Sequence, residues 1–369
     1  MTVFSADDGR HMACALQLAR RGLYTTDPNP RVGCVLVRDG EVVGEGWHER
    51  AGGPHAEVVA LAAAGARSRG ATAYVSLEPC CHHGRTPPCT RALIAAGVAR
   101  VVAAIPDPNP KIASQGIAEL EQAGIRVDIG LMQAEAERLN RGFISRMTRA
   151  RPWVRVKLAA SLDGRTALAS GESKWITCEA ARADVQRLRA SSSAILTGVG
   201  TVLADDPSLT VRDFDIGRQP LRVVVDGHMS LRPEARLLHL PGNTLVVTAI
   251  DDDEYAEPLL AAGAEVMVLS AGPDAVDLAA LMQDLGQREA NDVLVEAGAT
   301  LCGGLLHAGL VDELVLYLAP HLLGSGARGL FNLPGLERMQ DRIALRIADV
   351  RAVGQDWRIT ARVTDNGES

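Results

Sequence analysis

The sequence contains no apolar run long enough to cross a lipid bilayer. A membrane-spanning helix needs about 20 consecutive apolar residues, and the two most apolar stretches are interrupted, one by Arg100 and the other by Asp312 and Glu313. The N-terminal segment carries acidic residues where a secretory signal would have a basic region followed by an apolar one. We therefore expect a cytoplasmic protein without a membrane segment.

The sequence also lacks an excess of basic residues. It has 38 Lys and Arg against 45 Asp and Glu, which gives a formal net charge of -7 at pH 7. Binding along a nucleic acid requires clustered Lys and Arg that displace counterions from phosphates. This balance favours a small-molecule substrate over a nucleic acid.

Repeats, low-complexity tracts and the Gly-rich fingerprint of a Rossmann domain are missing as well. The closest loop, from Gly298 to Gly304, lacks the required glycine spacing. Hydrophobic residues make up 47% of the sequence and charged residues 22%, enough to pack a folded core. Because a domain has about 150 residues, 369 residues predict two domains.

Helix and strand patterns alternate through the first 150 residues. Residues 11–22 have the spacing of an amphipathic helix, and Asp39-Gly40 between two alternating runs predicts a tight hairpin. The alternation predicts an α/β sandwich around one sheet. The remaining expected elements are helices at 55–66, 90–98, 115–124 and 135–147 and strands at 72–79, 100–105 and 125–130.

A basic segment, residues 141–151, ends at Pro152, and we interpret it as a solvated linker helix. We place the boundary near residues 147–152, which gives domains 1–150 and 151–369. The α/β pattern then restarts. Its expected strands are 153–160, 193–198, 221–226, 244–250, 264–269, 292–298 and 312–320, and its helices are 178–190, 276–287 and 300–308.

The sharpest chemical signal is His55-Ala-Glu57 followed by Pro79-Cys80 and, nine positions later, Cys89. One His and two Cys can hold Zn²⁺ and leave one coordination position for a water molecule, whose pKa the metal lowers. A zinc deaminase needs in addition a Glu that binds no metal and carries protons. We expect His55, Cys80 and Cys89 to be the zinc ligands and Glu57 to be the catalytic residue.

The cysteine spacing leaves alternatives open. The general deaminase signature separates its two cysteines by two residues, whereas here Cys81, His82 and His83 lie between Cys80 and Cys89 and could complete the site. A structural zinc loop that does not use His55 is a further alternative. Five cysteines have no partner at a spacing typical of a metal site or a disulfide, and we expect them to be free thiols without a chemical role: Cys14, Cys34, Cys81, Cys178 and Cys302.

The motifs HAE and EPCCHHGRTPPC resemble those of the pyrimidine deaminases of riboflavin biosynthesis. That family usually has Ser at the position of Cys81, so the resemblance implies that Cys81 is not a ligand. It also implies a cytidine-deaminase-like α/β sandwich. The implied substrate contacts are Asn29, His48, Asp107 and Asn109.

The runs KLAASLDGRTA, SGESKWIT, ILTGVGTVLADDPSLTVR, VEAGATL and GLVDELVLYLAPHLLG resemble the riboflavin-specific reductases, whose fold is similar to dihydrofolate reductase. The two resemblances together cover nearly the whole chain. The implied contacts to the nicotinamide cofactor are Ala159, Trp175, Thr201, Asp205, Gly298, Ala299, Thr300, Leu301, Cys302, Gly303 and Gly304. The implied substrate contacts are Ser173, Arg189, Leu209, Arg212 and Glu296, of which the arginines suit a phosphate.

One cofactor loop departs from the family pattern. After the strand at 221–226 the chain reads Gly227-His228-Met229, where the family tends to have a Ser and a nearby Arg suited to a 2′-phosphate. The preference for NADPH, with Gly227 in contact with the cofactor, is thus implied by the resemblance and not by these residues. His228 or Arg232 would have to supply the missing contact.

The resemblance implies a bifunctional enzyme that uses one zinc ion and NADPH. It would deaminate 2,5-diamino-6-ribosylamino-4(3H)-pyrimidinone 5′-phosphate by hydrolysis and then reduce the ribosyl group to ribityl. Two rivals are a nucleoside or tRNA deaminase with a degenerate appendage and a zinc-stabilised sensor without turnover. Glu57 argues against the sensor, because a structural zinc has no use for a proton carrier. Association into a homo-oligomer stays open.

Overall fold

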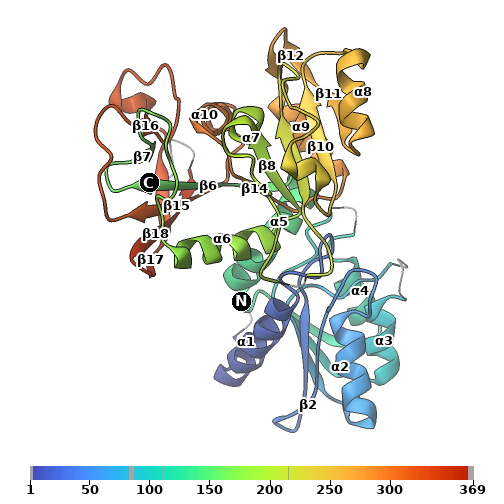
Figure 1. Ribbon diagram of the computed structural model, residues 1–369. Helices are drawn as coiled ribbons and strands as arrows, with labels where there is room; N and C mark the ends of the chain where they lie inside the picture. Colours follow the sequence, from blue (N-terminus) through green and yellow to red (C-terminus); the bar gives the residue numbers. More distant parts are fainter. Residues whose placement is uncertain (1–2, 83–86, 111, 215, 365–369) are drawn as a thin grey trace. The chain divides into compact units, whose positions relative to one another are not determined.

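The computed structural model describes residues 3–82, 87–110, 112–214 and 216–364. The chain separates into two compact units, Met1–Ala150 and Arg151–Ser369 (Figure 1). Each unit has its own sheet and its own hydrophobic core. Within the described part of the chain, no helix has the length and apolar character that crossing a membrane requires.

Unit 1 is a three-layer α/β sandwich around a five-stranded sheet of order β2-β1-β3-β4-β5. β1 is antiparallel to β2 and β3, while β3, β4 and β5 are parallel. Helices α1 and α5 cover one face, and α2, α3 and α4 cover the other (Figure 1). The bounds are α1 Ala6–Arg21, β1 Gly33–Arg38, β2 Glu41–Trp47, α2 Ala56–Ala64, β3 Thr72–Val75, α3 Cys89–Ala96, β4 Arg100–Ala103, α4 Gln115–Gln122, β5 Arg126–Ile129 and α5 Gln133–Arg149.

Local sequence explains how unit 1 is assembled. The predicted hairpin is confirmed, with positive φ angles at Asp39 and Gly40 in its turn. Helix α1 begins at Ala6, earlier than residue 11, because Ser5 and Asp8 form a capping box. Gly33 of β1 permits close contact with α1, since a Cβ there would lie 2.0 Å from the Ala15 carbonyl oxygen.

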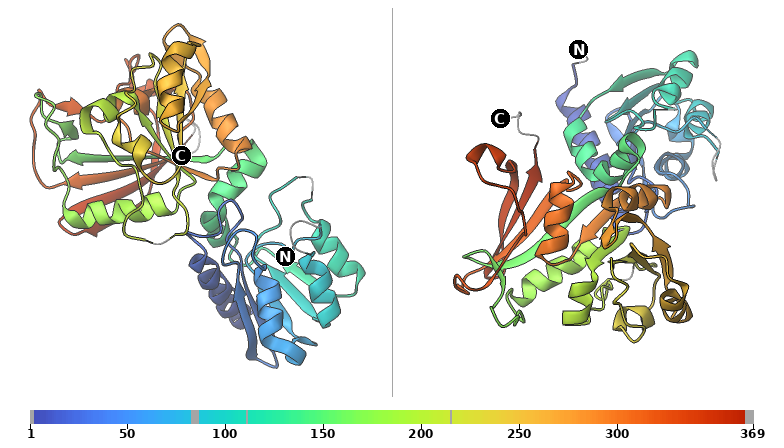
Figure 2. Two further views of the ribbon diagram at one scale, coloured as in Figure 1. Left: turned by 45° about the vertical axis from the view of Figure 1, so that its right-hand side comes forward. Right: turned by 90° about the horizontal axis from the view of Figure 1, so that it is seen from above.

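Unit 2 is built on a nine-stranded sheet of order β11-β10-β9-β8-β14-β6-β15-β18-β17. The first seven strands are parallel, and β18 and β17 are antiparallel. Helices α9 and α10 pack on one face and α6, α7 and α8 on the other (Figure 2). The strands are β6 Trp153–Ser161, β8 Ala194–Gly198, β9 Leu221–Val225, β10 Thr244–Thr248, β11 Glu265–Val268, β14 Asp292–Val295, β15 Glu313–Ala319, β17 Leu345–Val353 and β18 Asp356–Val363. The helices are α6 Glu179–Ala190, α7 Val199–Asp205, α8 Asp253–Ala261, α9 Leu278–Gln287 and α10 Ala299–His307.

Every strand and helix that the sequence predicts in unit 2 is present, but several elements were not predicted. Helix α7 has only seven residues, and α8 contains Pro258, so neither has a strong helical pattern. The β17–β18 hairpin escapes notice because β17 mixes charged and apolar residues and is exposed.

The interpretation of residues 141–151 as a solvated linker helix is wrong. Most of this segment belongs to α5, which buries Asn140, Gly142 and Ser145 in unit 1. Arg146 donates to the Pro28 carbonyl oxygen at 3.0 Å. Arg146 therefore binds a carbonyl group of unit 1, and Arg151, at the end of the segment, pairs with Asp312 of unit 2 at 3.0 Å.

A buried charge network ties α1 to the sheet of unit 1. Asp8 Oδ1 accepts hydrogen bonds from the Tyr74 hydroxyl and from Arg100 Nη1, both at 2.7 Å. Arg100 Nε also donates to Asp128 of β5 at 2.7 Å. Burial alone would raise the pKa of Asp8, but the hydrogen bonds from Ser5, Arg100 and Tyr74 hold it well below its usual range.

Asp8→Asn should lower the free energy of unfolding at pH 7 by about 1.5–3 kcal/mol, because a charged acceptor of buried hydrogen bonds is lost. The pKa of Asp8 is lowered by folding, so its contribution is present above the unfolded value of about 3.9 and disappears as the pH falls through the folded value. The difference between Asp8→Asn and the parent should therefore shrink below about pH 4. Urea unfolding at pH 7 and pH 3 measures it, with exposed Asp7→Asn as control. A difference independent of pH would contradict the network.

Candidate functional site

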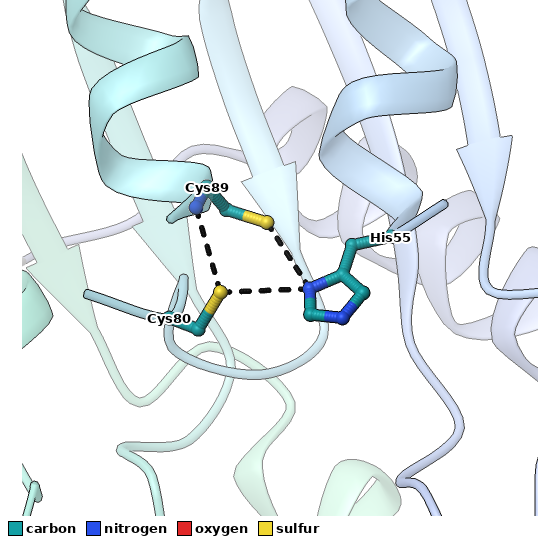
Figure 3. A group of neighbouring side chains, drawn as sticks. All are labelled: His55, Cys80 and Cys89. Atoms are coloured by element: carbon teal, nitrogen blue, oxygen red, sulfur yellow. Dashed lines mark hydrogen bonds between the residues drawn. The ribbon is translucent and has the colours of Figure 1, made fainter. Parts of the chain in front are cut away.

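Three metal-binding side chains meet at the carboxyl end of the unit 1 sheet. His55 precedes α2, Cys80 follows β3, and Cys89 begins α3 (Figure 3). His55 Nδ1 lies 3.5 Å from Cys80 Sγ and 3.3 Å from Cys89 Sγ. The three ligand atoms all lie within 4.8 Å of one another, so the structure brings the predicted ligands together.

The spacing of these atoms fits zinc. Zn–S bonds of about 2.3 Å and Zn–N bonds of about 2.0 Å at tetrahedral angles separate nitrogen from sulfur by about 3.5 Å. The hydrogen bond between the two thiols lowers the pKa of Cys80 and raises the pKa of Cys89. Cys80 is thus ready as a thiolate, and a bound metal would displace the proton of Cys89.

Glu57 lies beside this cluster in the first turn of α2. Its side chain is buried and forms a hydrogen bond with Cys89, but it is not part of the three-ligand group. Burial, together with the charge of Cys80, raises the pKa of Glu57 to about 7. A carboxyl group with such a pKa can both accept and donate a proton near neutral pH.

The alternative ligands do not join the cluster within the described ranges. Cys81 is half-buried and stays outside the group of three, and burial raises the pKa of its thiol. His82 is exposed. His83 lies outside the described residues. The position of His55 in the cluster favours the predicted ligand set over a loop site that does not use it.

Asn29 and His48 lie together on one side of the cluster formed by His55, Cys80 and Cys89. Asn29 Nδ2 is 3.0 Å from His48 Nε2, and His48 Nδ1 is 3.0 Å from the Pro54 carbonyl oxygen. The ring centroids of His48 and His55 are 5.4 Å apart. Burial lowers the pKa of His48, so its ring is neutral, donates through Nδ1 to Pro54 and accepts from Asn29.

Asp107 follows β4 and is held by Glu78, a residue that sequence reasoning missed, and the Asp107 side chain accepts the Asn109 backbone N–H at 2.8 Å. The buried Glu78 carboxylate accepts backbone N–H groups from Asp107 and Ser114 through Oε2, at 2.8 and 3.0 Å. Its Oε1 accepts from Gly116 and Ile117 at the start of α4, at 2.9 and 3.2 Å. The sequence signal that could have indicated Glu78 is an acidic residue at the end of a buried strand, since buried acidic residues are rare unless they are paired.

Asn140 of α5 holds the loop that carries Asn29 and was also missed. Its Oδ1 accepts from the Arg31 backbone N–H at 2.8 Å, and its Nδ2 donates to the Arg31 carbonyl at 3.0 Å. Asn140 is fully buried at a kink in α5. No sequence pattern distinguishes this asparagine, because its partner is more than a hundred residues away.

Several residues that the resemblance assigns to a reductase site lie along the carboxyl edge of the unit 2 sheet. β9, β8, β14 and β6 are adjacent and parallel, so the segments after them emerge at one edge. Such an edge is where open α/β sheets bind ligands. The predicted residues found there are Ala159 near the end of β6, Thr201 in α7 after β8, Gly227 after β9 and Glu296 after β14.

The 298–304 loop forms the start of α10. Gly298 is its extended N-cap and has no side chain to cap the helix, so the first-turn backbone N–H groups suit an anion. Cys302 is fully buried, and a Cβ at Gly303 would lie 1.9 Å from the Asn332 carbonyl oxygen. Cys302 and Gly303 thus pack inside unit 2, and the cofactor contact of residues 298–304 stays a prediction, best placed at residues 298–301.

The segment of Ser173 and Trp175 reaches α7 through an ion pair. Lys174 Nζ lies 3.4 Å from Asp205 Oδ1 at the end of α7. Trp175 is 70% exposed, and the Arg182 guanidinium stacks over its ring at 4.6 Å. Two of the predicted cofactor residues, Trp175 and Asp205, thus belong to neighbouring segments.

The two predicted phosphate-binding arginines differ in their surroundings. Arg189 donates to both Glu296 oxygens, at 2.6 and 3.1 Å, and to the Thr210 carbonyl beside buried Leu209. Lys157 Nζ is 3.6 Å from Glu296, and although burial alone would raise the pKa of Glu296, these two cations lower it to about 2. Arg212 is exposed and open to a ligand.

The departure at Gly227 has a packing reason. A Cβ at this position would lie 2.5 Å from the Asp274 carbonyl oxygen, so a Ser cannot replace Gly227 without a shift. The next residue, His228, pairs with the Asp274 carboxylate at 3.2 Å, and both side chains are exposed. Arg232 is exposed as well.

Comparison with known proteins identifies the family to which each unit is similar. The cytidine and deoxycytidylate deaminase zinc-binding region matches residues 5–105, and the RibD C-terminal domain matches residues 152–359. The chain is 54% identical to the riboflavin biosynthesis protein RibD of Escherichia coli, over 95% of this chain and 97% of that protein. It is 48% identical to that of Haemophilus influenzae, over 98% of both chains.

Two solved structures cover 97% of this chain and 99% of their own. One is RibD of Acinetobacter baumannii, with 47% identity and a TM-score of 0.90. The other is a diaminohydroxyphosphoribosylaminopyrimidine deaminase/5-amino-6-(5-phosphoribosylamino)uracil reductase of Thermotoga maritima, with 33% identity and a TM-score of 0.86. Fold and site together define a zinc deaminase domain joined to a reductase domain of the dihydrofolate reductase type. The chain belongs to the RibD family of riboflavin biosynthesis proteins.

Glu78→Gln should loosen the segment that carries Asp107 and Asn109, because the amide would turn N–H donors toward backbone N–H groups. We expect the free energy of unfolding to fall by about 2–4 kcal/mol. Zinc should stay near one ion per chain, and KM for deamination should rise more than kcat falls. Metal analysis, urea unfolding and steady-state kinetics measure these effects.

The matched control is Glu121→Gln, an exposed glutamate on α4. It should leave stability and KM unchanged. Parent-like stability of Glu78→Gln would show that the carboxylate does not hold the segment.

Proposed function

We propose that this chain catalyses two consecutive steps of riboflavin biosynthesis. The first is hydrolytic deamination of 2,5-diamino-6-ribosylamino-4(3H)-pyrimidinone 5′-phosphate, and the second is NADPH-dependent reduction of the ribosyl group to ribityl. The observation that carries the proposal is the cluster of His55, Cys80 and Cys89 with buried Glu57 beside it, in a chain of the RibD family. The Thermotoga maritima relative is named for the same pair of activities.

In the deaminase, His55, Cys80 and Cys89 would hold the zinc ion. When bound, zinc supplies the Lewis acidity that makes water a nucleophile near neutral pH. Glu57 would accept the proton of the attacking water and pass it to the leaving ammonia. Its burial and its raised pKa suit both transfers, since one carboxyl group must take and return a proton in a single turnover.

Substrate binding in the deaminase is assigned to two pairs of residues. Asn29 and neutral His48 offer amide and imidazole groups on one side of the cluster. Asp107 and Asn109 offer polar groups on the segment held by Glu78, where burial raises the pKa of the Asp107 carboxyl. These groups match a pyrimidine with exocyclic amines and a ribose.

In the reductase, the start of α10 at residues 298–301 would bind the diphosphate of NADPH, and His228 or Arg232 its 2′-phosphate. Ala159, Trp175, Thr201, Asp205 and Gly227 complete the proposed cofactor set. When bound, NADPH supplies the hydride. The sheet edge would hold the sugar carbon against the nicotinamide and fix its orientation.

The reductase substrate is assigned to the other side of the same edge. Arg212 would bind the ribose phosphate, while Arg189 fixes the Glu296 carboxylate so that it faces the substrate. Ser173 and Leu209 complete this set. A site that pairs with a carbonyl oxygen would reject the undeaminated amine, because mismatched buried donors cost about 1–3 kcal/mol each.

We assign one activity to each unit, with deamination in residues 1–150 and reduction in residues 151–369. The separate sheets and cores support this division. The proposed partners are small molecules, without nucleic acid, and the proposed location is the cytoplasm. Association into a homo-oligomer is part of the proposal.

Glu57→Gln tests the deaminase assignment. The variant should retain one zinc per chain, because Glu57 is not a ligand, and should lose deamination by about 10²-fold or more. Ammonia release and metal analysis measure the two effects. Loss of zinc from Glu57→Gln would refute the role of Glu57.

The cysteines supply the matched comparison. Cys80→Ser or Cys89→Ser should lower the zinc content and destabilise unit 1, because metal binding is coupled to folding. Cys81→Ser should be nearly silent. If Cys81→Ser abolished zinc binding, the ligand set would be wrong.

A further inference from the structure

The segment that carries Leu209 and Arg212 has a strained backbone. Leu209 is 2% exposed and has a φ of 46°, in the left-handed region that bulky side chains rarely adopt. Such a conformation persists only where the surrounding structure holds it, and it is concentrated at functional sites. The connection from α7 to β9 contains the segment, so no strand or helix fixes it. Side chains from elsewhere in unit 2 must hold it in place.

Two glutamines hold the backbone of this segment. Gln219, two residues before β9, accepts the Val211 backbone N–H through Oε1 at 2.8 Å and donates through Nε2 to the Val211 carbonyl oxygen at 2.9 Å. Gln186 of α6, which is buried, accepts the Arg212 backbone N–H at 3.1 Å. Val211 is buried as well, so the side chain of Gln219 takes the place that water would have at an exposed loop.

The two predicted phosphate-binding arginines have different tasks in this arrangement. The Arg189 guanidinium donates to the Thr210 carbonyl oxygen and to both Glu296 oxygens, so its donors are largely used inside the protein. The Arg212 side chain is exposed and is the one available to a phosphate. A guanidinium binds a phosphate well only when it is held in the right place. The position of Arg212 depends on the backbone that the two glutamines hold.

We propose that Gln219 and Gln186 are positioning residues of the reductase, which set its affinity for the phosphate group of the substrate by holding the backbone of residues 211–212. Both act through Arg212. This role rests on the proposed function, the reduction of a ribosyl phosphate. It implies that loss of either glutamine weakens recognition of the phosphate and leaves the hydride transfer itself intact.

Gln219→Met tests this role, because methionine has a similar length and no charge but makes neither hydrogen bond. KM for the deaminated pyrimidine phosphate should rise by about tenfold, while kcat and KM for NADPH stay within about twofold of the parent. With the dephosphorylated compound, kcat/KM should stay unchanged. Gln186→Met removes one hydrogen bond and should raise the same KM by a smaller factor. The matched control is Gln283→Met, on the exposed side of α9, which should change none of these values.

The Arg212→Ala background separates a positioning role from a general structural one. If Gln219 acts through Arg212, adding Gln219→Met to Arg212→Ala should change KM by less than about twofold, because residues that act as one unit are not additive. Thermal melting and unchanged deamination verify folding, and Gln186→Met decides if Gln219→Met does not fold. Equal losses with the phosphorylated and dephosphorylated compounds, or additive effects in the double variant, would overturn the inference.

Binding measurements separate this inference from the proposed function. Calorimetric titration of both compounds without NADPH gives their affinities free of turnover. A parent that binds the phosphorylated compound more tightly but oxidises no NADPH would refute the proposed reduction, and a lower affinity ratio in Gln219→Met would still support the role of Gln219. A parent-like affinity ratio in Gln219→Met would overturn that role, whatever the activity of the parent.

Discussion

Parallel strand pairing is the constraint on which both candidate sites depend. Parallel strands run in one direction, so every connection between them must leave from the same edge of the sheet. In unit 1 this edge brings Cys80, after β3, and Asp107, after β4, close to His55 at the start of α2. In unit 2 the same rule aligns the ends of β9, β8, β14 and β6. Side chains far apart in sequence therefore converge without long loops.

The edge positions need rigid support, and buried polar groups supply it. Glu78 holds four backbone N–H groups, and Asn140 holds both backbone groups of Arg31. In unit 2, Arg189 and Lys157 hold the side-chain carboxylate of Glu296. Each pairing is satisfied inside the protein, where an unpaired polar group would cost several kcal/mol. The candidate site residues thus lie on loops whose positions are fixed by buried polar pairings.

Local patterns in the sequence were enough to predict most elements that carry the candidate site residues, but not helix α7 with Thr201 and Asp205. Hydrophobic periodicity located the strands and helices around His55, Cys80 and Glu296, and the turn residues Asp39-Gly40 located the hairpin. Contacts between distant segments could not be read in this way. Asn140 and the basic end of α5 bind a loop more than a hundred residues away, and Arg189 is paired with Glu296 in the fold. The exposed β17 lacks a buried face to give it a pattern.

The central claim is that two separate sites act in sequence, and zinc removal tests it most directly. NADPH oxidation should be recorded with the diamino pyrimidine phosphate and with its deaminated product, before and after treatment with a zinc chelator. Chelation should stop oxidation with the diamino compound and leave oxidation with the deaminated compound unchanged, and added zinc should reverse its effect. Equal loss with both compounds, or continued oxidation with the diamino compound after zinc is removed, would contradict it.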